Sequence, residues 1–394
     1  MKQHKRPIFT VIIILLLLII SCRKPTAPSE HGPYMLWSRT FGGAGYDNGN
    51  SIQQTSDGGY IIVGRTTSSD TGEFDVYLIK TDTYGNLSWA KTYGGSNWDG
   101  GYSVQVTSDG GYIIAGRTNS FGAGYKDVYL IKTDQNGDTL WTKTYGGPDE
   151  ELGFSVQQTS DGGYIIAGYT RSFGAGSADA YLIKTDDQGE ILWTKTYGGT
   201  NSDVVLSVQQ ISDGGYIIAG STSSFGSGNM DVYLIKTDEN GNTIWTRTYG
   251  GEDLDSGHSV RQTSEGGYII TGSTSSYGSG VVDVYLIKTD ANGDTLWTKT
   301  YGGANTDKGY SVQQTSDGGY IIVGYTNSFG AGSYDVYLIK TDNNGDILWT
   351  KTYGGTYEDI GFSVQETSED VYIIVGLTTS FGAGLTDVYL IKIR

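Results

Sequence analysis

Two series of carboxylates recur along the chain every 52 residues, and their chemistry depends on whether the fold gathers them. The first series, here called the acidic ring, consists of Asp47, Asp99, Glu151, Asp203, Asp255, Asp307 and Asp359. The second consists of Asp75, Asp127, Asp179, Asp231, Asp283, Asp335 and Asp387. Seven like charges near one opening repel one another unless a cation such as Ca²⁺ or a basic partner lies among them. The alternative is structural: each carboxylate accepts hydrogen bonds from backbone N–H groups of its own loop.

Three segments of the form Asp-x-Asn-Gly-Asp, at residues 134–138, 290–294 and 342–346, resemble part of a calcium-binding loop. They lack the alternating acidic ligands and the distal glutamate of an EF-hand. A tight hairpin turn, in which Asn-Gly adopts positive φ, explains them better. We therefore predict no cofactor, with Ca²⁺ as the one ion to test.

Catalytic side chains other than carboxylates are scarce. His258 is the only histidine after residue 31. The equivalent positions in the other repeats are Asn50, Tyr102, Phe154, Leu206, Tyr310 and Phe362. Such variety is typical of a packing position rather than of a general base. No two carboxylates stand apart from the repeats as a glycosidase pair would. We therefore predict a protein that is not an enzyme, with a polysaccharide-acting enzyme as an alternative.

Residues 1–21 have the features of a signal peptide: a basic head and an apolar run from Val11 to Ile20, too short to cross a bilayer. The sequence Ile19-Ile20-Ser21-Cys22 resembles the lipobox of bacterial lipoproteins, whose cysteine carries the lipid. The resemblance implies lipidation of Cys22 and a place in the bacterial cell envelope, on the extracytoplasmic side, with membrane contact through the lipid alone. Residues 22–33, which hold three of the five prolines, are predicted to be a flexible tether.

Between residues 34 and 394 the elements that position these side chains repeat seven times. Trp recurs at a constant step of 52, at positions 37, 89, 141, 193, 245, 297 and 349. In the second copy, residues 103–107, 112–118, 127–134 and 139–145 have the composition of β-strands, with Asp-Gly and Asn-Gly at the turns. Runs such as Tyr-Ile-Ile-Ala-Gly are apolar on both faces, as in a sheet packed between two others.

Seven units of four antiparallel strands predict an all-β fold, a seven-bladed β-propeller. The chain begins with a segment of the fourth type, residues 36–43, and ends with one of the third type, residues 387–394. We therefore expect the N-terminal strand to complete the last blade and close the ring, because closure removes exposed sheet edges. The segment DVYLIKTDQNGDTLWTKTYGG, residues 127–147, resembles the β-propeller repeat of secreted bacterial proteins. This resemblance extends over residues 36–394 and implies the same fold.

Variation between the repeats is concentrated near residues 96–102 and 125–126 and their equivalents. In a four-stranded meander the loops after the second and fourth strands emerge at one end, so the variation shares one face. Six residues there form the predicted binding face: Tyr46, Trp98, Tyr125, Lys126, Tyr334 and Tyr357. Phe74 and Met230 lie in the same loops. Aromatic side chains stack on sugars and anchor protein partners, although loops also drift neutrally.

Charge narrows the choice of partner. The chain has 26 Lys and Arg against 43 Asp and Glu, a net charge of −17, which disfavours nucleic acid. The predicted function is recognition of a cell-surface glycan or protein by a monomer. A structural subunit of an envelope assembly is the alternative.

Overall fold

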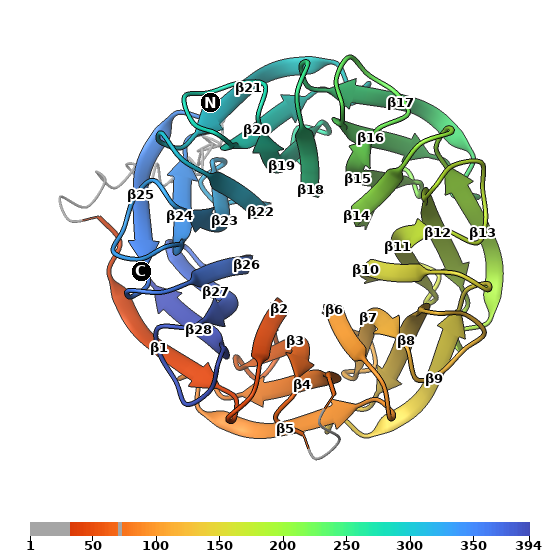
Figure 1. Ribbon diagram of the computed structural model, residues 1–394, viewed down its shortest axis with the longest axis horizontal. Coiled ribbons are helices and arrows are strands. Elements are labelled where there is room, and N and C mark those ends of the chain that lie inside the picture. The colour runs from red at the N-terminus through yellow and green to blue at the C-terminus, as the bar shows by residue number, and fades with distance from the viewer. Residues whose placement is uncertain (1–31, 70–72) are drawn as a thin grey trace, which may run out of the picture. The chain divides into compact units, whose positions relative to one another are not determined.

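The computed structural model describes residues 32–69 and 73–394. The predicted signal peptide, Cys22 and the predicted tether up to residue 31 lie outside the described residues. Within these, seven four-stranded antiparallel sheets stand around a central opening (Figure 1). The prediction of a seven-bladed β-propeller is confirmed.

Each blade is a meander whose first strand is innermost, a point that the sequence leaves open. The innermost strands are β2 (Asp47–Gln54), β6 (Asp99–Val106), β10 (Glu151–Gln158), β14 (Asp203–Gln210), β18 (Asp255–Gln262), β22 (Asp307–Gln314) and β26 (Asp359–Ser368). The second strands are β3 (Tyr60–Thr66), β7 (Tyr112–Thr118), β11 (Tyr164–Thr170), β15 (Tyr216–Thr222), β19 (Tyr268–Thr274), β23 (Tyr320–Thr326) and β27 (Val371–Thr378). The third strands are β4 (Asp75–Thr81), β8 (Asp127–Thr133), β12 (Asp179–Thr185), β16 (Asp231–Thr237), β20 (Asp283–Thr289), β24 (Asp335–Thr341) and β28 (Asp387–Ile393). The outermost strands are β5 (Leu87–Tyr93), β9 (Thr139–Tyr145), β13 (Ile191–Tyr197), β17 (Thr243–Tyr249), β21 (Thr295–Tyr301), β25 (Ile347–Tyr353) and β1 (Met35–Phe41).

The seventh blade joins the two ends of the described chain, in the strand order β1-β28-β27-β26. β1 pairs antiparallel with β28, and Tyr34 and Arg394 exchange backbone hydrogen bonds just beyond the ladder. The expected closure by the N-terminal strand agrees with this pairing. The strand covers the edge that β28 would otherwise expose.

The core lies between blades, which explains both the apolar strands and the spacing of the tryptophans. β7 and β8 are buried along their whole length because each blade is sandwiched between two neighbours. Trp89 of the outermost strand packs against Tyr112 of the next blade, with ring centroids 6.1 Å apart. The same contact joins Trp37 of β1 to Tyr60 of the first blade. The repeated Trp is therefore a blade-to-blade contact.

The innermost strand is longer than the sequence suggested. We expected it to begin at Ser103 and placed Asp99 in the preceding loop; this prediction is wrong, because β6 begins at Asp99. Residues Asp99–Gly101 pair with β7, and the register then shifts by one residue at a bulge around Tyr102. The prediction relied on composition, and Asp99, Gly100 and Gly101 are residue types that are depleted in strands.

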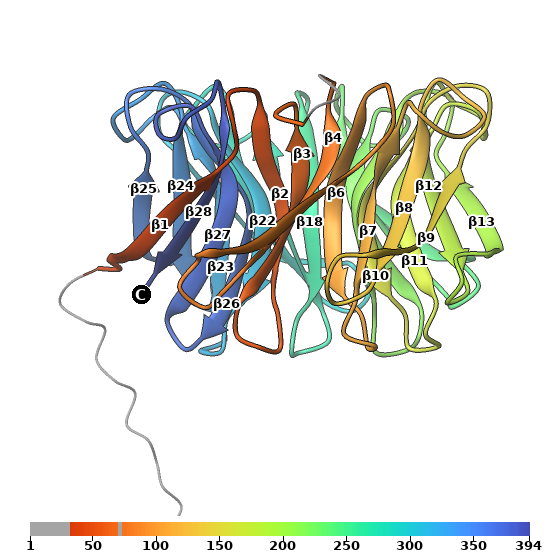
Figure 2. The same cartoon turned by 90° about the horizontal axis from the view of Figure 1, so that it is seen from below.

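The ring has two different rims (Figure 2). The turns after the first and third strands form one rim, the turn pole. The connections after the second and fourth strands form the other, the loop pole, where those after the second strands are the longest of each blade. In the described part of the chain, no helix is long and apolar enough to cross a membrane.

Candidate binding face at the loop pole

Neighbouring blades touch at the loop pole through short parallel bridges. In each bridge, a residue just before a third strand pairs with a residue just before the innermost strand of the next blade, as Lys126 does with Glu150. At the first junction Asp99 N–H donates to Phe74 O, which places Phe74 beside Trp98. Each junction therefore presents two side chains at the loop pole, and these side chains differ from one junction to the next.

The seven junctions fall into two arcs. One arc carries aromatic or charged pairs: Tyr334 with Glu358, Thr386 with Tyr46, Phe74 with Trp98, and Lys126 with Glu150. The other carries small or aliphatic pairs: Ala178 with Ser202, Met230 with Leu254, and Val282 with Thr306. All six residues of the predicted binding face lie in the first arc, and Met230 lies in the second. Whether this arc binds a ligand stays a prediction.

Within the first arc, Trp98 lies at the centre of the densest group of side chains. Phe74 meets it edge to face with centroids 4.9 Å apart, and Tyr46 lies 6.4 Å from Phe74. Trp98 and Tyr125 line a hollow of about 410 Å³ together with Glu73, Asn97, Asn119 and Gly124. The Tyr125 side chain is 65% exposed. The hollow therefore combines two aromatic side chains with amide and carboxylate groups.

Two arginines that the sequence reasoning missed hold Trp98 in place. The Arg117 guanidinium carbon lies 3.8 Å from the centroid of the Trp98 ring, and that of Arg65 lies 5.5 Å away. Burial and the neighbouring charge of Arg117 lower the pKa of Arg65. Comparison of the repeats would have revealed both, because this position holds Arg only here and otherwise Tyr169, Ser221, Ser273, Tyr325 and Leu377.

The remaining predicted residues are spread along the arc. Lys126 is engaged by Glu150 at 2.6 Å, and its Nζ lies 5.0 Å from the Tyr125 ring. Tyr334 packs edge to face on Tyr325, with centroids 4.9 Å apart. Tyr357 is 64% exposed. The structure thus brings Trp98 and Tyr125 together and leaves Tyr334 and Tyr357 two or more junctions away.

The acidic ring is buried, and each member accepts a hydrogen bond from a backbone N–H of the loop that precedes it. Asp99 is 1% exposed, and its Oδ2 accepts hydrogen bonds from Gly95 N–H at 2.8 Å and Ser120 Oγ at 2.6 Å. Glu151 accepts the equivalent bond from Gly147 N–H. This is the capping role expected from the structural alternative. A Cβ on Gly94 would collide with Asp75 of the second series, so glycine is required between the two series.

The cation alternative has less support from the geometry. The Oδ1 atoms of Asp47, Asp99, Asp203, Asp255, Asp307 and Asp359 have no hydrogen-bond partner among the described residues. However, within that part of the chain no three His, Cys, Asp or Glu side chains converge as metal ligands. Binding of Ca²⁺ stays a question for experiment.

His258 packs against the next blade. Its Nδ1 donates to Gly309 O of the next blade at 2.7 Å, and its ring lies 5.1 Å from that of Tyr310. Burial lowers the pKa of His258 to about 4, against the opposing effect of the hydrogen bond to Gly309. The imidazole is therefore neutral at pH 7, with its proton held on Nδ1.

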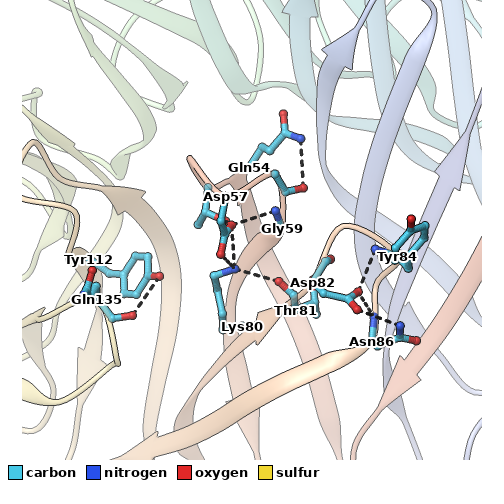
Figure 3. A network of polar contacts seen from close by, with 12 residues as sticks. Gln54, Asp57, Gly59, Lys80, Thr81, Asp82, Tyr84, Asn86, Tyr112 and Gln135 are labelled. Carbon is cyan, nitrogen blue, oxygen red and sulfur yellow. Dashed lines mark hydrogen bonds and ion pairs between the residues drawn. The ribbon is translucent and has the colours of Figure 1, made fainter.

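The calcium-like segments are turns between the third and fourth strands, at the turn pole. Figure 3 shows the equivalent turn of the first blade. Asp82 Oδ1 accepts hydrogen bonds from Tyr84 N–H and Asn86 N–H, both at 2.8 Å. Asp134, in the first calcium-like segment, accepts the same two bonds from Asn136 and Asp138. These aspartates close hairpin turns, which is the interpretation that the sequence favoured.

A closed ring with a varied loop pole defines the class of protein: a seven-bladed β-propeller, a fold suited to binding and interaction. No family model matches the chain. Regulatory protein FlaEY of Caulobacter vibrioides is 30% identical over 175 residues, which cover 38% of this chain and 18% of that protein. The match thus spans less than a fifth of that relative.

Solved structures resemble the chain in fold. The WD40 domain of Neurospora crassa Pan2 has a TM-score of 0.51 at 9% identity, covering 88% of this chain and 89% of that chain. Sqt1 from Chaetomium thermophilum has a TM-score of 0.49 at 12% identity, covering 86% and 83%. At these identities the Pan2 likeness supports the propeller fold and carries no information on ligands.

Proposed function

We propose that the protein is a non-catalytic binding module that recognises a cell-surface glycan through the loop pole. One observation carries the proposal: Trp98 and Tyr125 line a hollow of about 410 Å³ in which Asn97, Asn119 and Glu73 supply polar groups. Sugar rings present an apolar C–H face and a rim of hydroxyls, and ring faces beside amides and a carboxylate complement both.

The N-terminal sequence supports a proposal for where the protein acts. The segment Ile19–Cys22 resembles a lipobox, so we propose a lipid on Cys22 and a location on the extracytoplasmic side of a bacterial membrane. In this arrangement the propeller is a receptor held close to the glycans of the envelope.

The test is a titration of the full-length protein, in a non-ionic detergent, against an array of glycans and envelope polysaccharides with and without Ca²⁺. We expect saturable binding that Trp98→Ala or Tyr125→Ala abolishes. Leu254→Ala is the matched control, because Leu254 is 51% exposed at the same pole but lies in the other arc. Equal binding by Tyr125→Ala and the wild type would contradict the proposal.

A protein partner is the second candidate, favoured by the exposed residues that continue beyond the hollow to Tyr46 and Tyr357, which are 50% and 64% exposed. Sugar sites are local, whereas protein interfaces extend over about 800 Å² on each side. Absence of glycan binding, together with co-purification of a fixed partner that is lost on Tyr46→Ala and Tyr357→Ala, would establish this alternative and the scaffold role.

A further inference from the structure

The central channel contains a second feature, distinct from the loop pole. Its cavity of about 480 Å³ is lined by serine, aliphatic and glutamine residues of the innermost strands, such as Ser51, Ile52 and Gln53. None of the described residues that line it is Asp or Glu, although the chain as a whole carries a net charge of −17. The lining is therefore polar without being acidic.

A girdle of glutamines joins the blades around this cavity. In six blades, the glutamine side chain accepts a hydrogen bond at its Oε1 from a backbone N–H of the next innermost strand. Gln209 accepts from Gln262 N–H at 2.8 Å, and Gln313 accepts from Glu366 N–H at 2.9 Å. The other four acceptors are Gln53, Gln105, Gln157 and Gln365. Each bond satisfies an N–H at the inner edge of a sheet.

The girdle is broken once, at Arg261. This residue occupies the seventh glutamine position, but a guanidinium has no acceptor atom. Its one hydrogen bond among the described residues runs to Val260 O at 2.9 Å, and none of their carboxylates forms an ion pair with it. The next inner-edge N–H, that of Gln314, therefore lacks the glutamine acceptor that the equivalent N–H groups have among the described residues of the other six blades. Arg261 thus places a charged donor beside the same cavity as an inner-edge N–H without its glutamine partner.

We propose that Arg261 and the Gln314 N–H form a binding site for a small oxyanion, a phosphate or carboxylate group, inside the channel. The planar guanidinium donates two parallel N–H groups to the two oxygens of such an anion. The amide N–H supplies a further donor of the kind that anion sites use. The cavity of about 480 Å³ has room for the anion, and its lining contains no competing carboxylate among the described residues.

The test is calorimetric titration of the full-length protein, in a non-ionic detergent, with inorganic phosphate and separately with succinate. We expect saturable binding of at least one anion, weakened at least tenfold by Arg261→Gln. The two arms show whether the site prefers the phosphate or the carboxylate geometry. Arg261→Lys keeps the positive charge but loses the two parallel N–H donors of the guanidinium. We therefore expect this variant to bind the anion more weakly than the wild type and more tightly than Arg261→Gln.

Two controls separate the site from general charge effects and from misfolding. Arg171→Gln removes a cation of the loop pole that pairs with Glu150, and it should leave anion binding unchanged. Arg261→Gln restores the glutamine of the other six blades, so its melting temperature should equal or exceed that of the wild type. The proposal is overturned if the wild type binds neither anion or if Arg261→Gln binds as well as the wild type.

Discussion

The two poles of the ring are built from the same seven repeats, yet one is nearly uniform and the other is varied. At the turn pole, a lysine of the third strand reaches an acidic residue of the first turn in six blades, as Lys80 does with Asp57 at 2.9 Å (Figure 3). At the loop pole, no two junctions carry the same pair of side chains among those described.

The physical roles of the two sets of residues explain the difference. Lys80 also donates a hydrogen bond to Thr81 O. Partial burial acts to raise the pKa of Asp57, but hydrogen bonds from Thr55, Lys80 and Gly59 lower this pKa to about 2. Each turn-pole residue thus satisfies several backbone groups. The junction pairs at the loop pole are held by backbone bonds, so their side chains are free to differ. Uniform positions carry the fold, and varied positions are where recognition can be specified.

The largest effect is expected from breaking the ring itself. Deletion of residues 34–43 removes β1, exposes the edge of β28, and takes Phe41 out of the core and Trp37 away from Tyr60. We expect a loss of at least about 5 kcal/mol of unfolding free energy, or aggregation, because total stabilities of domains are of this order. Denaturant unfolding followed by tryptophan fluorescence measures it.

A point substitution provides the matched control for this deletion. Trp37→Ala and Trp141→Ala remove the same kind of blade-to-blade contact, one in β1 and one inside the chain. They should cost equal amounts, about 3–5 kcal/mol each. A silent Trp37→Ala beside a costly Trp141→Ala would show that β1 does not close the ring.

A smaller effect tests whether the acidic ring has a structural role, like the uniform residues of the turn pole. Asp307 accepts bonds from Gly303 N–H at 2.8 Å and Ser328 Oγ at 2.6 Å, as Asp99 does from Gly95 N–H and Ser120 Oγ. Replacing either by Ala leaves buried donors unsatisfied, and we expect each to lose about 3 kcal/mol. Thermal unfolding with and without Ca²⁺ measures the loss. A Ca²⁺-dependent rise in the melting temperature of the wild type that Asp307→Ala abolishes would favour the cation alternative instead.

Sequence periodicity predicted the blades, the closing strand and the capping role of Asp99 because these features repeat in register. It misplaced the start of β6 because Asp99, Gly100 and Gly101 do not have the composition typical of a strand. It also missed Arg117 and Arg261, although each departs from the residues at the equivalent positions of most other repeats, because the prediction relied on what the repeats share. The sequence did not show which strand of each blade is innermost, because the strand order of a meander is compatible with either edge strand facing the channel.

The pH dependence of stability gives an intermediate effect at His258, a varied position of the innermost strands. The ordinary histidine pKa of 6.5 falls to about 4 at His258, so between these values the unfolded chain binds more protons than the folded one. Stability therefore decreases as the pH falls from 6.5 to 4, by on the order of 2 kcal/mol after allowance for partial exposure, and is unaffected by His258 above this range.

His258→Phe isolates that contribution, because Phe154 and Phe362 occupy the equivalent positions. The variant should lose the part of the acid slope that belongs to histidine, while the carboxylates contribute equally to both proteins. Denaturant melts at pH 4, 5.5 and 7.5 measure the difference. Identical slopes in the two proteins would mean that the folded state does not disfavour the imidazolium.

The smallest effect on stability is expected where the effect on function is largest. Tyr125→Ala removes a side chain that is 65% exposed and whose one ring contact among the described residues is with Lys126 Nζ at 5.0 Å. The free energy of unfolding should therefore change by no more than about 0.5 kcal/mol. Glycan binding should nevertheless be lost, because the ring is one wall of the hollow beside Trp98. Unfolding and binding measured on the same preparation give both numbers. A large loss of stability would show that Tyr125 stabilises the fold. The contrast between a structural turn pole and a binding loop pole would then not hold at Tyr125.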